Sequence, residues 1–550
     1  MTWVEIERNR RRLRRERGTV VKDWGGRLPI ALVYPNTYYV GMSSLGFQAI
    51  YGILNSFTTV VCERVFCEES AGKGSGSFSS LSVESQRPLA DFAVLAFSIS
   101  YELDYFNVVR LLNSIGMPLF ADERDERHPL VIAGGPCITS NPEPLAPFLD
   151  AMVIGEGEVV LPEMVSTLVR AVGGSREELL NELSFLPGVY VPAAKRVGPV
   201  QRQWARHLDD FATTSVILTP DTDLANMYLI EIARGCGRGC RFCLAGFAFR
   251  PFRHRSLDRL LAQARPGLGG RVGLVGAAVA DHPSIDELMA CLRQRGSRIA
   301  VSSLRADAVS EAMVKALAES GTRTVVLAPE AGPERLRCII NKSVSEEHLL
   351  RATDLVARHG IPVLKLYYVI GLPTETEDDI REMIRLTLAL KERRERWGNS
   401  TRLVVNASPF VPKAGTPFQW LPMASGAELE HRLSMLRTAL RPRGIKVSGE
   451  GVAWSVVQGV LARGDRKVAA VLARSGGGLS LSAWRRALEE EGIDLSTYLY
   501  RRIPDEERLP WSTVESGVER SYLQREMERA LGGLQTPSCP PSDCHFCGVC

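Results

Sequence analysis

This 550-residue sequence lacks the features of a membrane or secreted protein. No apolar run approaches the ~18 residues that a membrane-spanning helix requires, and the longest, around residues 272–280, is more typical of a buried strand. Residues 1–18 are crowded with Arg and Glu and do not contain the apolar core of a signal peptide. We therefore expect a cytoplasmic protein with no membrane partner.

Net charge and sequence repetition are also scarce. A net charge of +4 is too small to indicate a nucleic-acid partner by itself, although it leaves one open. No internal repeat or long low-complexity tract is visible. With 45% hydrophobic and 24% charged residues, the composition is that of a globular protein with large cores, and the length suggests about three to four domains. Residues 1–27 predict a basic helix and linker, for which a solvated face is favoured over an anionic partner.

Cysteine is present twelve times, and its distribution argues against disulfides. Seven of the twelve fall in two tight clusters near residue 240 and at the end of the chain. In a large cytosolic chain such clusters are typical of metal sites. The scattered cysteines are predicted to be reduced and mostly buried; they are Cys62, Cys67, Cys137, Cys291 and Cys338.

The first cluster is the most informative stretch of the sequence. Cys236, Cys240 and Cys243 stand at C-x3-C-x2-C spacing among glycines that let a loop wrap closely around a cofactor. Three thiolates can hold three irons of a [4Fe–4S] cube and leave the fourth iron open. A structural zinc ion needs four ligands, and no His or fourth Cys follows at finger spacing.

This triad resembles the signature of the radical S-adenosylmethionine (SAM) superfamily. The resemblance implies that the amino and carboxylate groups of SAM chelate the open iron, and that one electron cleaves SAM to a 5′-deoxyadenosyl radical. Phe242, just before the last cysteine, resembles the family's aromatic residue near the SAM adenine. Shielding of the cluster from solvent is the alternative role for this side chain.

Short apolar runs alternate with helical stretches from residue 28 onward, which indicates an α/β fold. A first block predicts an open parallel sheet of the Rossmann-like type, with ligands at the carboxyl ends of its strands. Its expected strands are Ile30–Tyr34, Phe92–Ser98, Leu130–Gly134 and Ala151–Ile154.

A second block of six strand–helix repeats predicts a partial (β/α)6 barrel, with function on the loops after the strands. The triad follows the first of these strands directly. Ser345 is placed to cap one predicted helix, Glu346–His359, and another is expected at Asp378–Glu395. The expected strands are Tyr228–Ile232, Val272–Val279, Ile299–Ser302, Thr324–Ala328, Val363–Ile370 and Leu403–Ser408.

Later strand ends carry further resemblances to the SAM contacts of the family. Small residues at Gly273 and Gly276 resemble the segment near the SAM amino group. Arg305 is a plausible bidentate partner for the SAM carboxylate, and Glu330 resembles the contact to the ribose or methionine moiety. The corner formed by Gly371 and Pro373 resembles the loop against the adenine, although a plain turn into the next helix is the alternative.

Two longer phrases narrow the resemblance. The segments Lys365–Tyr368 and Pro409–Trp420 resemble those of radical SAM proteins that have an N-terminal cobalamin-binding-type domain. More narrowly, they resemble those of a branch with a cysteine-rich C-terminal tail. The resemblance covers about residues 28–550. It implies domains at 1–27 (basic segment), 28–200 (cobalamin-binding-like), 201–420 (radical SAM core), 421–535 (helical) and 536–550 (cysteine tail).

The N-terminal block departs from the cobalamin pattern at two positions. The familiar motif is Asp-x-His-x-x-Gly, whereas the corresponding loop, 36–41, has Asn36 for Asp and Tyr38 for His. Ser98, Gly134 and Gly135 keep the later features of a nucleotide-tail site. Three hypotheses are open: cobalamin bound without a lower protein ligand, another ligand in the same cleft, or a structural domain.

The second cysteine cluster closes the chain at C-x4-C-x2-C-x2-C spacing, in a tail with little core of its own. Four thiolates suit an auxiliary [4Fe–4S] cluster or zinc, and the company of the triad favours iron–sulfur. His545 lies inside this cluster and could replace a cysteine. The four cysteines, called the tail cysteines below, are Cys539, Cys544, Cys547 and Cys550.

The family resemblance implies an enzyme that cleaves SAM reductively for radical methylation or another C–H functionalisation, with or without cobalamin. An external one-electron reductant of the flavodoxin or ferredoxin type is the expected partner. The sequence does not identify the substrate, and no catalytic side chain is singled out. Sulfur insertion of the methylthiotransferase kind and a non-catalytic two-cluster electron carrier are the alternatives.

Overall fold

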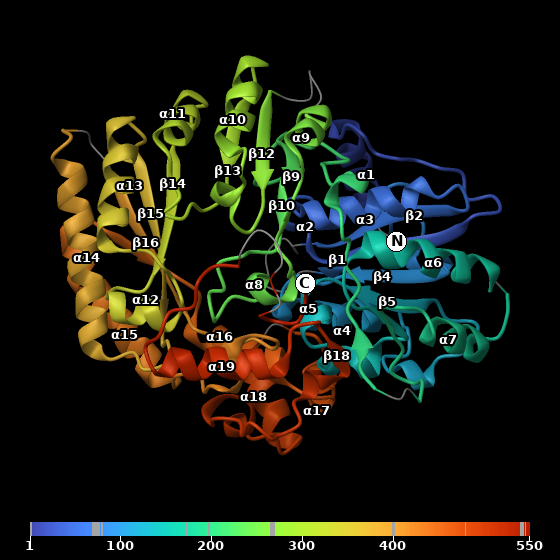
Figure 1. Ribbon diagram of the computed structural model, residues 1–550. Helices are drawn as coiled ribbons and strands as arrows, with labels where there is room; N and C mark the ends of the chain where they lie inside the picture. The colour runs from blue at the N-terminus through green and yellow to red at the C-terminus, as the bar shows by residue number, and fades with distance from the viewer. Residues whose placement is uncertain are drawn as a thin grey trace.

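A computed structural model shows two groups of parallel strands side by side, with a helical C-terminal region packed below them in the view of Figure 1. The C-terminus lies at the centre of this view, beside α8 (Ala245–Ala248). The structure describes residues 3–68, 77–78, 81–171, 173–195, 198–264, 270–398, 402–478, 480–539, 544 and 546–550.

The N-terminal sheet has the strand order β3-β2-β1-β4-β5-β6-β7 in the described part of the chain. The five inner strands are parallel and the two edge strands antiparallel. After β1 the chain adds β2 on one side of it and later adds β4 on its other side, so the order of the strands switches between β1 and β4. Such a switch point opens a crevice at the carboxyl ends of the strands. The strands are β1 (Leu28–Thr37), β2 (Val60–Glu68), β3 (Ser77–Phe78), β4 (Val94–Ser98), β5 (Leu130–Gly134), β6 (Ala151–Val153) and β7 (Val189–Tyr190).

Alternate residues of these strands enter two different cores, because side chains of a strand point to opposite faces. Ile30 and Leu32 belong to the core beneath helices α3 and α6, whereas Ala31 and Val33 belong to the core beneath α4. Both faces of the sheet are therefore covered, as expected for parallel strands. The helices are α3 (Leu45–Ser56), α4 (Tyr105–Ser114) and α6 (Gly157–Arg170).

The four strands expected in this block are confirmed as β1, β4, β5 and β6, and β5 has the predicted bounds. Strand β2 was not anticipated from the sequence. Every residue of β2 is buried, yet Glu63, Arg64 and Glu68 interrupt its apolar character. Because these charged side chains are buried and bond to other groups inside the protein, the strand lacks the apolar pattern by which buried strands are recognised in a sequence.

The second block forms two parallel sheets, with the orders β13-β12-β9 and β14-β15-β16-β17. A single bridge between Leu304 and Leu327 joins them. The six predicted strands are confirmed, and β17 adds a seventh from beyond residue 420. The strands are β9 (Tyr228–Glu231), β12 (Arg271–Val275), β13 (Arg298–Val301), β14 (Thr324–Glu330), β15 (Val363–Ile370), β16 (Arg402–Pro409) and β17 (Lys446–Ser448), and a small hairpin adds β10 (Ala233–Arg234) and β11 (Arg253–His254).

Helices between these strands begin at caps that the sequence contains. Ser345 and His348 form a reciprocal capping box at the start of α13, and Thr376 and Asp379 form another at the start of α14. Figure 1 shows both helices on the outer left face of β14, β15 and β16. The helices of this block are α10 (Ile285–Gln294), α11 (Glu311–Glu319), α12 (Glu334–Ile339), α13 (Glu346–Arg358) and α14 (Glu377–Glu395).

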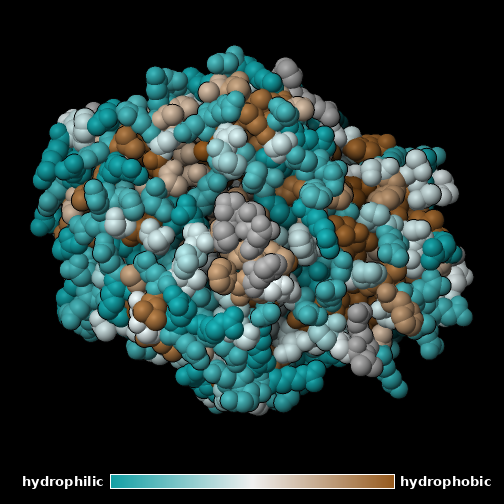
Figure 2. Space-filling view, in the orientation of Figure 1, coloured by the Kyte–Doolittle hydropathy of each residue, from teal (hydrophilic) through white to brown (hydrophobic). Residues whose placement is uncertain are grey.

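The C-terminal region is mainly helical, as predicted, and contacts both blocks. Helix α17 packs against α4 of the first block, and α19 packs against α12 of the second. The described residues contain no helix that is both long and apolar enough to cross a membrane. Figure 2 shows a largely hydrophilic face over α13 and α14, with apolar residues gathered on the right, over the N-terminal block. The helices are α15 (Gly426–Leu440), α16 (Val452–Arg463), α17 (Lys467–Arg474), α18 (Leu481–Glu490) and α19 (Arg520–Leu531).

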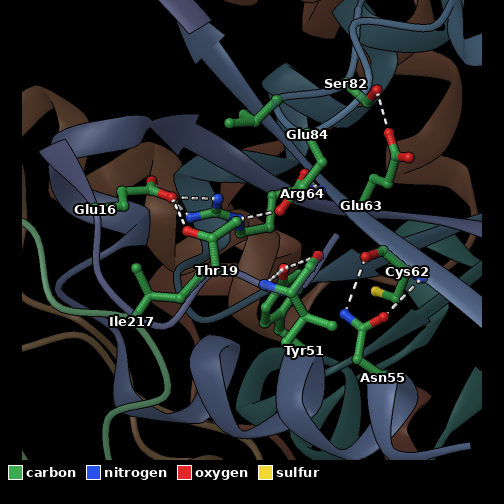
Figure 3. A network of polar contacts seen from close by, with 12 residues as sticks. Glu16, Thr19, Tyr51, Asn55, Cys62, Glu63, Arg64, Ser82, Glu84 and Ile217 are labelled. Atoms are coloured by element: carbon green, nitrogen blue, oxygen red, sulfur yellow. Dashed lines mark hydrogen bonds and ion pairs between the residues drawn. The ribbon is translucent and has the colours of Figure 1, made fainter. Parts of the chain in front are cut away.

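A buried ionic network ties the N-terminal segment to the first sheet (Figure 3). The guanidinium of Arg64 on β2 bonds Glu16 at 2.7 Å and Glu84 at 2.6 Å, and all three side chains are almost fully buried. Nearby, Arg12 of α1 (Trp3–Arg15) reaches Glu68 at 2.6 Å. Part of the basic N-terminal helix is thus used inside the molecule.

Arg64→Met should destabilise the protein by about 3–5 kcal/mol, because it leaves Glu16 and Glu84 buried without their cation. The free energy of unfolding from urea titration measures this loss. Arg14→Met is the matched control, since Arg14 meets Glu7 on an exposed face. A loss below about 1 kcal/mol for Arg64→Met would show that the network carries little stability.

Candidate functional site

The triad loop, residues 235–243, follows β9 and β10 at the carboxyl end of the second block. Gly235 and Gly239 adopt φ values of +77° and +66°, and a Cβ on Gly235 would stand 2.4 Å from the carbonyl oxygen of Phe249. Asn341 braces the loop, because its side-chain amide donates to two loop carbonyls at 3.2 Å each. These turns place the three cysteines on one fixed loop.

The triad thiols lie close enough to influence one another. Burial, together with the neighbouring Cys240 and Cys236, raises the pKa of the Cys243 thiol to about 12. Metal binding needs thiolates, so the site requires positive charge nearby. Arg305 provides some of it, with its Nη1 3.9 Å from the Sγ of Cys240.

The donor set fits an iron–sulfur cube better than a single ion. Among the described residues, no three Cys, His, Asp or Glu side chains converge tightly enough to hold one metal ion. In a cube each thiolate binds a different iron, so the sulfurs surround the cluster and need not meet at one point. Three thiols on one loop beside a guanidinium satisfy that requirement.

Arg305 belongs to a charged group on the strand ends around the triad. Its guanidinium contacts Asp307 at 3.0 Å, and Asp307 also faces Arg238 of the triad loop at 3.4 Å. Arg238 pairs more closely with Asp281, at 2.6 Å. The third strand end and the triad loop are therefore held together by alternating charges, and the role of Arg305 toward the SAM carboxylate stays a prediction.

Glu330 also lies at this site, at the end of β14. It has a φ of +66°, a conformation that non-glycine residues rarely adopt, and it pairs with Lys342 at 3.1 Å. Lys342 is buried and near Cys240 and Arg305. It is a candidate site residue that sequence reasoning missed, since it follows α12 and not a strand.

Two predicted contacts to the adenine side meet in one apolar cluster. Phe242 packs against a group that includes Leu372 and Ala331, from the loops after β15 and β14. Gly371 has a φ of +78° and donates its N–H to Glu375 at 2.6 Å, which shapes the corner that Pro373 continues. Burial raises the pKa of Glu375 to about 7.

A cavity of about 460 Å³ connects the first block to the triad loop. Its walls come from α3, α6 and the strands of the N-terminal sheet. It reaches the carboxyl ends of that sheet and of β9 and β12 in the second block. Four residues predicted as cofactor contacts line it; they are Ser98, Gly134, Gly135 and Gly276. Gly235 of the triad loop lines the same cavity.

The glycines of this cavity differ in what they allow. A Cβ on Gly134 would make only ordinary contact, 3.5 Å from Cβ of Val153 in the cavity wall. Gly135 has a φ of +115°, and its Cβ would lie 2.4 Å from the carbonyl oxygen of Ile99. Gly134 therefore leaves open space for a ligand, whereas Gly135 is required by the backbone.

Gly273 does not line the cavity. A Cβ there would lie 2.7 Å from the Sδ of Met227, so its small size serves the packing of β12 against β9. Tyr38 lies elsewhere too: it is buried, and its hydroxyl donates to Glu16 at 2.6 Å.

A buried ionic group closes the junction between the two blocks beside the cavity. Arg234 bonds Glu156 of the first block at 2.7 Å and Glu231 of β9 at 2.8 Å. Arg253 bonds Glu156 at 2.7 Å as well. Although burial opposes it, these guanidinium groups lower the pKa of Glu156. Because Arg234 directly precedes the triad loop, the group sets the loop's position relative to the cavity.

The C-terminal tail reaches the triad loop. The backbone N–H of Cys539 donates to the carbonyl oxygen of Gly237 at 2.7 Å. Burial is the largest influence that raises the pKa of the Cys539 thiol, Arg250 opposes it, and the other three tail cysteines add to it. His545 lies outside the described residues.

Two family models match the chain, one for each α/β block. The model described as "Radical SAM proteins, N-terminal" matches residues 46–192, and the model of the radical SAM superfamily matches residues 230–387. The first match ends before Glu231 and Arg234, the two residues of the ionic group that precede the triad loop. The second match begins just before them, at residue 230.

Two proteins are similar to this chain in sequence, and one solved structure is similar to it in fold. An uncharacterized protein of Methanocaldococcus jannaschii is 29% identical over 86% of this chain and 96% of its own length. An uncharacterized methyltransferase of Pyrococcus horikoshii is 24% identical over 54% of this chain and 64% of its own length. The cobalamin-dependent SAM radical enzyme OxsB, with aqua-cobalamin bound, has a similar fold, with a TM-score of 0.50 and 14% identity over 76% of this chain and 62% of that chain.

Proposed function

The chain belongs to the radical SAM superfamily, and we propose that it cleaves SAM reductively at the triad and transfers a methyl group through cobalamin held in the cavity. The enzyme class follows from the family. The single observation that carries the methylation proposal is the cavity, which continues from the N-terminal sheet to the triad loop. A methyl carrier in it would meet SAM without leaving the protein.

The triad cysteines would hold the cluster, and the groups around them would receive SAM. Arg305 and Lys342 offer cations to the SAM carboxylate, and Glu330 offers a carboxylate to the amino or ribose groups. When bound, the cluster supplies one electron for SAM cleavage, and cobalamin carries the methyl group. The chain's own part is to orient SAM and to keep water away, through apolar contacts such as Phe242.

The cavity fits the tail of a cobalamin at its inner end. Hydroxyl groups of Ser98 and Ser100 stand at the carboxyl end of β4, and Gly134 leaves room beside them. The deeper wall is apolar, with Leu32 and Ile50 from β1 and α3. No histidine occurs in residues 1–127, so these residues would offer no imidazole ligand to the cobalt.

An external electron donor of the flavodoxin or ferredoxin type is the proposed partner, since the chain needs one electron per SAM cleaved. The observed similarity to an uncharacterized methyltransferase from Pyrococcus horikoshii supports methylation over sulfur insertion. The substrate stays open among an RNA, a peptide and a small metabolite.

Product analysis separates the two parts of this proposal. Anaerobically reconstituted protein with dithionite and SAM should release 5′-deoxyadenosine, and added cobalamin should make it release S-adenosylhomocysteine as well. Both products are measured by chromatography with mass detection. Release of 5′-deoxyadenosine alone, unchanged by excess cobalamin, would contradict methyl transfer through cobalamin and leave only adenosyl-radical chemistry.

A further inference from the structure

Residues 532–539 return from α19 to the triad loop and are anchored there by a buried arginine. Arg241 lies between two triad cysteines, and its side chain is fully buried. Its guanidinium donates to Glu526 of α19 at 3.0 Å and to the carbonyl oxygen of Leu534 at 2.8 Å. The triad loop and the start of the tail therefore share one buried polar core.

The next step of the tail contacts the same loop through its backbone. Thr536 donates its N–H to Asn341, the residue that braces the triad loop. Three residues later Cys539 bonds Gly237, and a Cβ on Gly237 would stand 3.6 Å from the Cβ of Cys539. Since Gly237 follows Cys236 directly, the first tail cysteine lies against the triad itself.

The remaining tail cysteines run from a buried inner side to an exposed outer edge. Cys544 and Cys547 are buried, and the carbonyl oxygen of Cys547 accepts the N–H of Glu519 at 2.9 Å. Cys550 is exposed, and so is Phe546, which directly precedes Cys547 and is 72% exposed. Such a group has one side against the triad loop and the other open to a partner.

A buried cation, Arg250, lies beside the triad loop and near Cys539 and Cys547. The Arg250 guanidinium lies 4.5 Å from the ring centre of Phe247 and 5.3 Å from that of Tyr522 on α19. Its Nε donates to Gly246, and a Cβ on Gly239 of the triad loop would come within 3.4 Å of its Nη2. Clusters with four thiolate ligands are anionic, so a buried cation at this place stabilises them.

We infer that the four tail cysteines hold a second iron–sulfur cluster and that this cluster receives the electron for the triad from a ferredoxin- or flavodoxin-type protein. The electron role rests on the proposed SAM cleavage, whereas the metal site does not. The donor protein loses one electron and the triad centre gains one. No bond forms or breaks in this transfer.

The double variant Cys544→Ser, Cys547→Ser tests both parts. Iron content should fall by about four per chain while zinc stays unchanged, and the reduced protein should lose one of two electron paramagnetic resonance signals. SAM cleavage driven by dithionite should be kept, because Cys236 and Cys243 are partly exposed to a small reductant. Cleavage driven by reduced flavodoxin should fall at least about tenfold.

Cys291→Ser is the matched control, since this partly buried cysteine lies on α10, outside both clusters. If the double variant does not fold, Cys550→Ser changes an exposed ligand and should alter the same resonance signal. Loss of zinc with unchanged iron would overturn the cluster. An unchanged flavodoxin-driven rate after iron loss would overturn the electron role. Wild-type protein that holds about eight irons but never cleaves SAM would instead contradict the proposed function.

Discussion

Replacement of Cys236, Cys240 or Cys243 by alanine, one at a time, should lower SAM cleavage at least about 1,000-fold, because a cube with an open iron needs all three thiolates. The release of 5′-deoxyadenosine under anaerobic conditions with dithionite measures the loss. Each variant should still fold, since the cysteines lie on a loop and outside the cores of the strands.

Two measurements guard this expectation against a folding defect. Far-ultraviolet circular dichroism and the thermal midpoint should match the wild type in each variant. Cys338→Ala, which removes a partly exposed cysteine of α12 near the tail, should keep normal turnover. Near-normal cleavage by any of the three triad variants would show that the cluster is not bound as proposed.

Local patterns in the sequence predicted the strands that are mainly apolar. Leu130–Gly134 and Val363–Ile370 have the predicted bounds, because the first is an apolar run that ends at a glycine and the second is interrupted only by Lys365 and stops before Gly371. The triad was also readable, since spacing along one loop fixes which thiols lie together. Such features depend on neighbours in the chain and need no knowledge of the fold.

Features that depend on distant segments escaped the sequence. β2 carries Arg64, whose partners are 48 and 20 residues away, so its buried charges looked like surface ones. Lys342 reaches the triad only because α12 returns to the loop that Asn341 braces. The docking of Cys539 on Gly237 joins residues about 300 positions apart, and no local pattern encodes it.

The glycines of the cavity show how structure sharpens a sequence hypothesis. The motif predicted that both Gly134 and Gly135 admit a ligand, and both line the cavity. Only the Cβ contacts separate a glycine that leaves space from one that the backbone conformation requires. A substitution meant to test ligand binding must therefore be made at Gly134, since a side chain at Gly135 would strain the turn itself.

Gly134→Val should weaken cobalamin binding at least about 100-fold, which equals ~2.8 kcal/mol, by placing a branched side chain in the cavity. Valine suits a strand, and its Cβ meets Val153 at an ordinary 3.5 Å, so the fold should be retained. Corrinoid absorbance that stays with the protein through gel filtration gives the affinity. The wild-type spectrum should be that of cobalt without an imidazole from residues 1–127, which contain no histidine.

Tyr38→Phe is the control and should leave the affinity unchanged, because that hydroxyl contacts Glu16 and not the cavity. A wild-type protein that stays colourless in excess cobalamin, yet cleaves SAM, would mean that the first block keeps its fold without this cofactor.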